Sequence, residues 1–109
     1  MGKTTRVVRS SGNVFADLEV GEAEEAFAKA EIASRIGEII AKRRLSQTRA
    51  AAILGVDQPK VSALMRGKLE GFSSDRLFRF LTALDQDVEI VIKVKREGSK
   101  HGRVRVVAG

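Results

Sequence analysis

The chain has 109 residues, of which 43% are hydrophobic, and this is enough for one small domain but not for two independent cores. It contains no cysteine, which excludes a disulfide framework and thiolate metal sites and suits a reducing, cytoplasmic compartment. No apolar stretch approaches membrane-spanning length, and the basic amino terminus lacks the apolar run of a secretory signal.

The formal net charge of +6 is unevenly distributed along the chain. Acidic residues gather between positions 15 and 31, basic residues between 42 and 68, and a second basic cluster lies between 93 and 105. A solvated surface is the ordinary explanation for a single run of charge. The basic cluster between 42 and 68 favours a binding surface instead, because it coincides with the motif described below.

Residues 22–44 are predicted to form a long first helix. Acidic residues near its start and basic residues at its end match the helix dipole. Its apolar residues recur at helical spacing along one stripe, which comprises Ala26, Ala30, Ile32, Ala33, Ile36, Ile39 and Ile40.

A second helix is predicted to follow at once and to run through Leu54. Leu45 and Ser46 supply an apolar residue and an N-cap before it. Gly55 comes after it and accepts the left-handed conformation in which helices often end.

The only proline of the chain, Pro59, lies where a third helix is predicted to begin. Asp57 is a good N-cap, so Pro59 falls in the first turn, where its missing N–H costs little. Because proline disfavours helical geometry in the preceding residue, Gln58 is the alternative cap. The fixed φ of the proline also offers a way to shape a helix start that approaches a ligand.

A fourth helix is predicted over 74–84, with Ser73 as its N-cap and with Phe72 and Leu77 as a hydrophobic staple. The apolar period then changes to an alternation over 88–94, which predicts a strand. A similar alternation over 103–107 allows a carboxy-terminal hairpin, which would be only marginally stable alone. This arm either pairs with a second copy or another protein, or packs as a simple strand on the helices.

The predicted organisation therefore has three parts. Residues 1–13 form a flexible basic segment, residues 14–86 form a helical domain, and residues 87–109 form a strand or hairpin arm with a basic tail.

The spacing over residues 47–66 is that of a helix-turn-helix unit. Ala51 is small enough for two helices to cross closely, and Gly55 permits a tight turn between them. Val61 and Leu64 are spaced to seat the second helix on the first. Because all these features occur in register within the most basic segment, the sequence favours DNA binding over a generic helical hairpin.

The segment "LSQTRAAAILGVDQPKVSALMRG", Leu45 to Gly67, resembles the Cro/CI-like, or XRE-type, regulators. The stretches "GNVFADL", "FSSDRLFRFLTAL" and "QDVEIVIK" are similar to the antitoxins of HigA-type toxin-antitoxin modules. The resemblance spans Gly12 to about Lys95. It implies a mainly α, lambda-repressor-like domain of four or five helices that binds a double-stranded DNA operator. It also implies a homodimer that represses its own operon in a bacterial or phage cytoplasm, at the nucleoid when bound to DNA, and binds a RelE/HigB-like ribonuclease toxin.

The second helix of a helix-turn-helix enters the major groove through its amino-terminal half. Gln58, Pro59, Ser62 and Ala63 lie on the face opposite Val61 and Leu64 and are the predicted base contacts. Gln58 can pair with adenine, Ser62 can donate or accept, and Pro59 and Ala63 can touch a thymine methyl group. The alternative for Gln58 is a solvated residue of the first turn.

The predicted phosphate contacts are Lys60, Arg66, Arg43 and Arg44, which would give affinity without specifying a sequence. Gln47 is added by resemblance, because the glutamine at that position in the family anchors to phosphate and braces the recognition-helix glutamine. The alternative for Arg66 is a partner for the dipole at the end of its helix.

An enzyme is the contrasting class, and the sequence offers no catalytic residue, metal site or cofactor motif for it. His101, the only histidine, lies in a loop of glycine, serine and lysine and is expected to be exposed. Asp85, Asp87 and Glu89 lack a visible basic partner in the sequence and are interpreted as surface residues. The remaining alternative to a repressor is a protein-interaction module or adaptor with only secondary, non-specific DNA binding.

Overall fold

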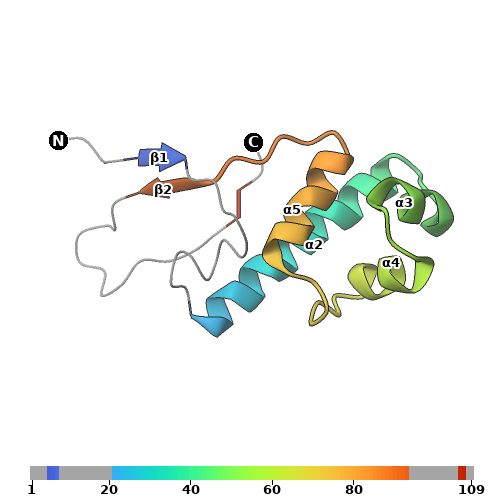
Figure 1. Ribbon diagram of the computed structural model, residues 1–109, viewed down its shortest axis with the longest axis horizontal. Helices are drawn as coiled ribbons and strands as arrows, with labels where there is room; N and C mark the ends of the chain where they lie inside the picture. Colours follow the sequence, from blue (N-terminus) through green and yellow to red (C-terminus); the bar gives the residue numbers. More distant parts are fainter. Residues whose placement is uncertain (1–4, 8–20, 94–105, 108–109) are drawn as a thin grey trace.

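The computed structural model describes residues 5–7, 21–93 and 106–107 (Figure 1). Its elements in chain order are strand β1 (Thr5–Val7), helices α2 (Glu22–Lys42), α3 (Gln47–Leu54), α4 (Gln58–Met65) and α5 (Ser74–Ala83), and strand β2 (Val91–Lys93). The described part of the chain is mainly helical, as predicted, and contains four helices.

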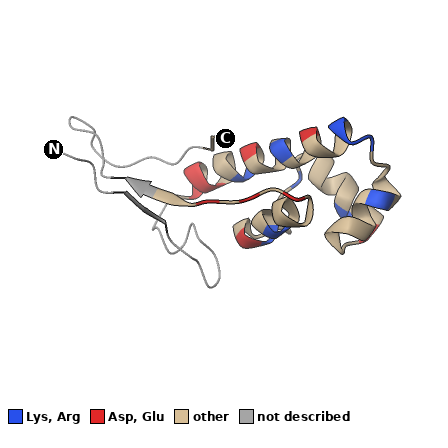
Figure 2. Ribbon diagram, turned by 90° about the horizontal axis from the view of Figure 1, so that it is seen from above, with Lys and Arg blue, Asp and Glu red and all other residues tan. Residues whose placement is uncertain are grey.

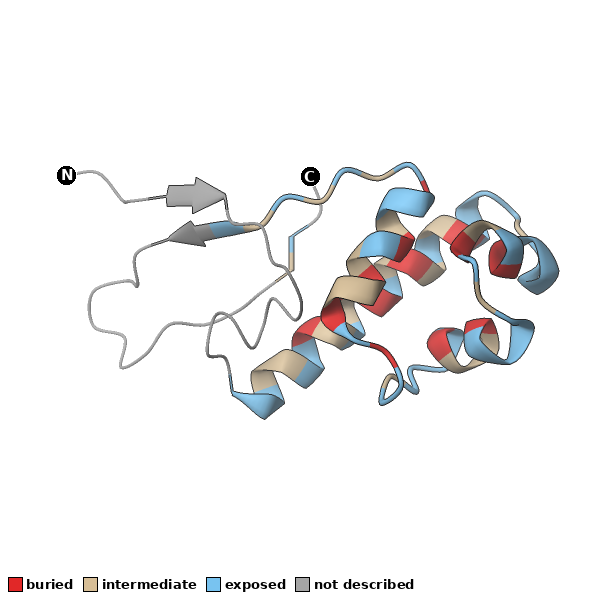
Figure 3. Cartoon of the chain, viewed as in Figure 1, coloured by how far each residue is buried: buried red, intermediate tan, exposed pale blue. Residues whose placement is uncertain are grey.

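All four helices contribute to one core (Figure 3). Helix α2 lies alongside α5, and α3 and α4 pack at the end of this pair where α2 finishes (Figure 1). The predicted stripe on α2 is confirmed for its isoleucines, but Ala26 and Ala30 are exposed, and Ala28 is the buried alanine near the helix start. The buried residues are Ala28, Ile32, Ala33, Ile36, Ile40, Ala50, Ala51, Leu54, Val61, Leu64, Phe72, Leu77, Phe80 and Leu84.

Helix α2 ends at Lys42, two residues before its predicted end, because Arg44 adopts a left-handed conformation with φ of 56°. The N–H of Arg44 donates to the carbonyl of Ala41, and the N–H of Leu45 donates to the carbonyl of Ile40, each at 3.0 Å. This pair of hydrogen bonds satisfies the last carbonyls of α2 and turns the chain into α3.

The predicted caps of α3 and α5 are confirmed. The Oγ of Ser46 accepts the N–H of Arg49 at 3.0 Å, and the Oγ of Ser73 accepts the N–H of Arg76 at 3.1 Å. Each serine oxygen satisfies one of the backbone donors that a helix start leaves unpaired. The two helices therefore begin where the sequence placed them.

The start of α5 is also fixed by aromatic packing. Phe72 and Leu77, the predicted staple, are both buried in the core. The rings of Phe72 and Phe80 meet edge to face with centroids 5.9 Å apart, and the guanidinium of Arg76 lies within 5.8 Å of each ring centroid. These contacts fix the segment before α5 against the first turns of that helix.

Strand β2 covers only Val91–Lys93 of the strand predicted over 88–94, and its partner differs from the prediction. Strand β2 pairs antiparallel with β1, with Thr5 opposite Lys93 and Val7 opposite Val91. Residues 106–107 are not in a strand, and 103–105 lie outside the described residues. A separate carboxy-terminal arm over 87–109 is therefore not supported, because the amino-terminal segment supplies the hydrogen-bonding partner.

Candidate nucleic-acid interface

Helices α3 and α4 pack against each other across a tight turn. Gly55 adopts a left-handed conformation with φ of 72°, which favours glycine because it has no β-carbon. The carbonyl oxygen of Ala51 accepts the N–H of Gly55 at 2.9 Å and the N–H of Val56 at 3.1 Å. Gly55 thus closes α3 and sets the direction in which α4 begins.

The residues predicted to pack the two helices together lie at their contact. Ala51 is 7% exposed, Val61 is fully buried and Leu64 is 2% exposed. Because these side chains face the core, the opposite side of α4 faces outward. The packing therefore turns one side of α4 away from the core.

Asp57, not Gln58, is the N-cap of α4. Its Oδ1 accepts the N–H of Lys60 at 3.0 Å, and its backbone is extended. Gln58 is then the first residue of α4 and Pro59 the second. Pro59 replaces a backbone donor that would otherwise have no partner within the helix, which answers why a proline is tolerated there.

The predicted base contacts differ in their exposure to solvent. Gln58 and Pro59 are exposed at the start of α4, while Ser62 and Ala63 are half-buried. Ala63 also packs against the edge of the core. The first turn is therefore the most accessible part of this face.

Three of the predicted phosphate contacts, Gln47, Lys60 and Arg66, are exposed on α3 and α4 or directly after α4. The Nε of Arg66 donates to the carbonyl of Ser62 at 3.4 Å, which holds its guanidinium along the last turn of α4 and agrees with the dipole alternative. Arg44 is exposed at the turn between α2 and α3.

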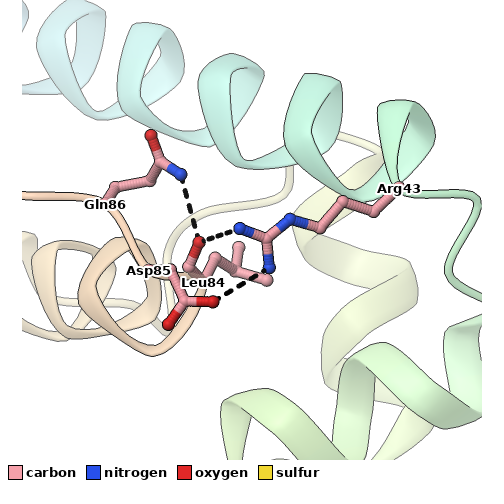
Figure 4. A network of polar contacts seen from close by, with 4 residues as sticks. All are labelled: Arg43, Leu84, Asp85 and Gln86. Atoms are coloured by element: carbon pink, nitrogen blue, oxygen red, sulfur yellow. Dashed lines mark hydrogen bonds and ion pairs between the residues drawn. The ribbon is translucent and has the colours of Figure 1, made fainter.

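The guanidinium of Arg43, the remaining predicted phosphate contact, makes polar contacts within the chain (Figure 4). Its Nη2 donates to the carbonyl oxygen of Leu84 at 2.6 Å, and its Nη1 lies 3.5 Å from Oδ2 of Asp85. Gln86 donates to the same carbonyl through Nε2 at 3.1 Å. The guanidinium therefore closes the end of α5, and Asp85 has the basic partner that the sequence did not reveal.

The described residues contain no group of three or more His, Cys, Asp or Glu that could hold a metal ion. Asp87 and Glu89 are exposed, as expected, and His101 lies outside the described residues. Among the helices that the structure describes, none has the length and apolar character needed to cross a membrane.

Comparison with known proteins agrees with this geometry. Residues 14–93 match a family described as a helix-turn-helix domain. A solved structure named "Putative XRE Family Transcriptional Regulator" is 52% identical, with a TM-score of 0.78; the match covers 82% of this chain and 100% of that one. No curated protein matches the chain. The chain therefore belongs to the helix-turn-helix family of XRE-type, DNA-binding transcriptional regulators.

Proposed function

We propose that the protein binds a specific operator as a homodimer and represses its own operon. The observation that carries this proposal is the first turn of α4, where Gln58 and Pro59 are exposed while Val61 and Leu64 fix the helix from behind. A rigid helix with an accessible amino-terminal half is what major-groove recognition requires. Gln58, Pro59, Ser62 and Ala63 are the proposed base contacts.

The proposed phosphate contacts are Gln47, Lys60, Arg66 and Arg44. Two of them precede Gln58 in the sequence and two follow it, and all four are exposed. Arg43 is left out of this set because its guanidinium is engaged by the end of α5. The functional unit in this proposal is the helical domain over 14–86.

Fluorescence anisotropy tests the proposal directly. The purified protein is titrated onto its own upstream DNA and onto a scrambled duplex across a salt series. We expect preference for the upstream DNA, with an affinity that falls as salt rises. Gln58→Ala should cost about 1–3 kcal/mol of that preference.

Gln86→Ala is the matched control, because it is the same change outside the helix-turn-helix unit and should leave the preference intact. Equal, weak binding of the parent protein to both duplexes would contradict the operator-binding proposal. In that case Gln58 and Ser62 are surface residues, and a protein-interaction module with non-specific DNA binding becomes the better explanation.

We also propose that the protein is the antitoxin of a toxin-antitoxin module and binds a RelE/HigB-like ribonuclease toxin. The acidic first turn of α2, with Glu22, Glu24 and Glu25, supports this because a ribonuclease that binds RNA presents basic surface. Co-expression with the product of the neighbouring gene should yield a complex in which hydrogen exchange slows at 21–31 and not in α4. Absence of a complex would contradict the antitoxin assignment and leave operator binding standing.

A further inference from the structure

Asp57 is the only acidic residue between positions 42 and 68, the segment that also carries the proposed phosphate contacts (Figure 2). It is exposed immediately before Gln58, and its side chain caps α4. A cap needs an acceptor oxygen and not a charge, because the neutral hydroxyl oxygens of Ser46 and Ser73 cap α3 and α5 in the same domain. The negative charge of Asp57 is therefore more than capping requires.

The cap occupies one of the two carboxylate oxygens of Asp57. Oδ1 accepts the N–H of Lys60 at 3.0 Å, which fixes the side chain at the start of α4 and leaves Oδ2 to accept a hydrogen bond from a ligand. None of the described lysines and arginines forms an ion pair with Asp57. An ionised carboxylate accepts hydrogen bonds and cannot donate them, so a group that pairs with Oδ2 must present an N–H or an O–H.

The major groove of a DNA duplex offers such donors at only two kinds of base. They are the exocyclic amino groups of cytosine N4 and adenine N6. Adenine N6 lies beside the acceptor N7 of the same base, and guanine presents two acceptors, whereas cytosine presents its N4 donor alone. A carboxylate that faces acceptors would place negative charge beside negative charge and weaken binding. Cytosine is therefore the base that an aspartate at the start of a recognition helix fits.

We propose that Asp57 is a specificity-determining residue that selects cytosine by accepting the N4 amino group at Oδ2, an assignment that rests on the proposed operator binding and adds one base to it. The selected cytosine lies in the base pair next to the one that Gln58 reads. Consecutive Cα atoms are about 3.8 Å apart, and successive bases of one strand are about 3.4 Å apart along the duplex axis. Two adjacent residues at the start of a helix therefore reach neighbouring base pairs.

Fluorescence anisotropy on single base-pair variants of the protein's own upstream DNA tests the assignment. The parent protein should prefer C·G by about tenfold at one position, next to the position whose preference is lost in Gln58→Ala. Asp57→Asn keeps a capping oxygen but adds an amide donor, which suits adenine, so the preference at that position should change from C·G to A·T. Asp57→Ser caps as Ser46 does but leaves no second oxygen, so it should bind all four base pairs there alike.

Cytosine methylated at N4 tests the hydrogen bond itself, because the methyl group replaces the N–H that faces the major groove while the other N–H stays in the base pair. At the selected position this base should weaken binding of the parent protein by about tenfold and leave Asp57→Ser unaffected. Asp85→Asn is the matched control, since it removes the same charge from an exposed residue outside the helix-turn-helix unit. It should behave as the parent protein does in both experiments.

Three results would overturn the selection of cytosine by Asp57. Unchanged base preferences in Asp57→Asn and Asp57→Ser, with unfolding midpoints near that of the parent protein, would leave the carboxylate with its capping role alone. A gain of affinity for all duplexes alike would show that the carboxylate only repels phosphate. Equal binding of the parent protein to its upstream DNA and to a scrambled duplex would overturn operator binding as well, whereas the first two results leave operator binding through Gln58 standing.

Discussion

The Nη2 of Arg43 donates a 2.6 Å hydrogen bond to the carbonyl oxygen of Leu84, 41 positions further along the chain. Arg43 directly follows α2 and Leu84 directly follows α5, so this bond ties the ends of two adjacent helices together (Figure 4). A cation at a helix carboxyl end also interacts favourably with the dipole. The bond therefore fixes α5 against α2, the helix that contributes the largest share of the core.

Arg43→Ala should lower the free energy of unfolding by about 1–2 kcal/mol, because the carbonyl of Leu84 loses a charged donor in a partly exposed setting. Urea denaturation measures this. Asp85→Asn should change it by less than about 0.5 kcal/mol, because the Asp85 side chain is 85% exposed and its ion pair is screened. A larger loss for Asp85→Asn than for Arg43→Ala would contradict this assignment of roles.

Arg44→Gly should affect folding and DNA binding in opposite directions. Arg44 has a φ of 56°, and glycine relieves the strain of a left-handed residue, so stability should rise by about 0.5–1 kcal/mol. Loss of the proposed phosphate contact should reduce the slope of log affinity against log salt by about 0.9. Denaturation and salt-series anisotropy measure the two effects. An unchanged slope would remove Arg44 from the DNA interface.

Asp57→Ala should destabilise the protein by about 0.5–2 kcal/mol, because the N–H of Lys60 loses its acceptor. Asp57→Asn retains an acceptor oxygen and should stay close to the parent. Thermal unfolding of the two variants side by side measures the difference. Equal losses would show that the carboxylate charge, and not the capping hydrogen bond, stabilises α4.

Pro59→Ala should leave stability within about 1 kcal/mol of the parent, since the second position of a helix accepts either residue. The substitution should instead change the preference of the protein among operator sequences, because the pyrrolidine ring is lost from the exposed first turn. Competition with operator variants changed at single base pairs measures it. If the operator variants have the same relative affinities for Pro59→Ala as for the parent protein, Pro59 serves only to begin the helix.

Most of the helical fold could be predicted because its signals are local. Ser46, Gly55, Asp57 and Ser73 act within a few residues of their own positions, and each takes its predicted role at a helix end. The spacing of the apolar residues predicted which helix faces are buried. The end of α2 was misplaced because Arg44 occupies a left-handed position that glycine usually fills, and its side chain gives no sign of this.

Long-range pairings could not be predicted in the same way. Nothing near Arg43 in the sequence indicates that it reaches Leu84, and the alternation after α5 predicts a strand without identifying its partner. The pairing of β2 with β1 depends on where the chain returns in space. For the candidate site, spacing alone located the turn and the outward face of α4, whereas the half-buried state of Ser62 required the packed structure.

The caps of α3 and α4 have a consequence for how the unit sits on a duplex. Ser46 is a neutral cap, so the partial positive charge at the start of α3 is left to attract phosphate. Asp57 places a carboxylate at the start of α4, and Pro59 withholds an N–H there, so that helix end repels phosphate. In the operator-binding proposal, this difference directs the start of α3 to the sugar-phosphate backbone and the start of α4 to the groove between the strands.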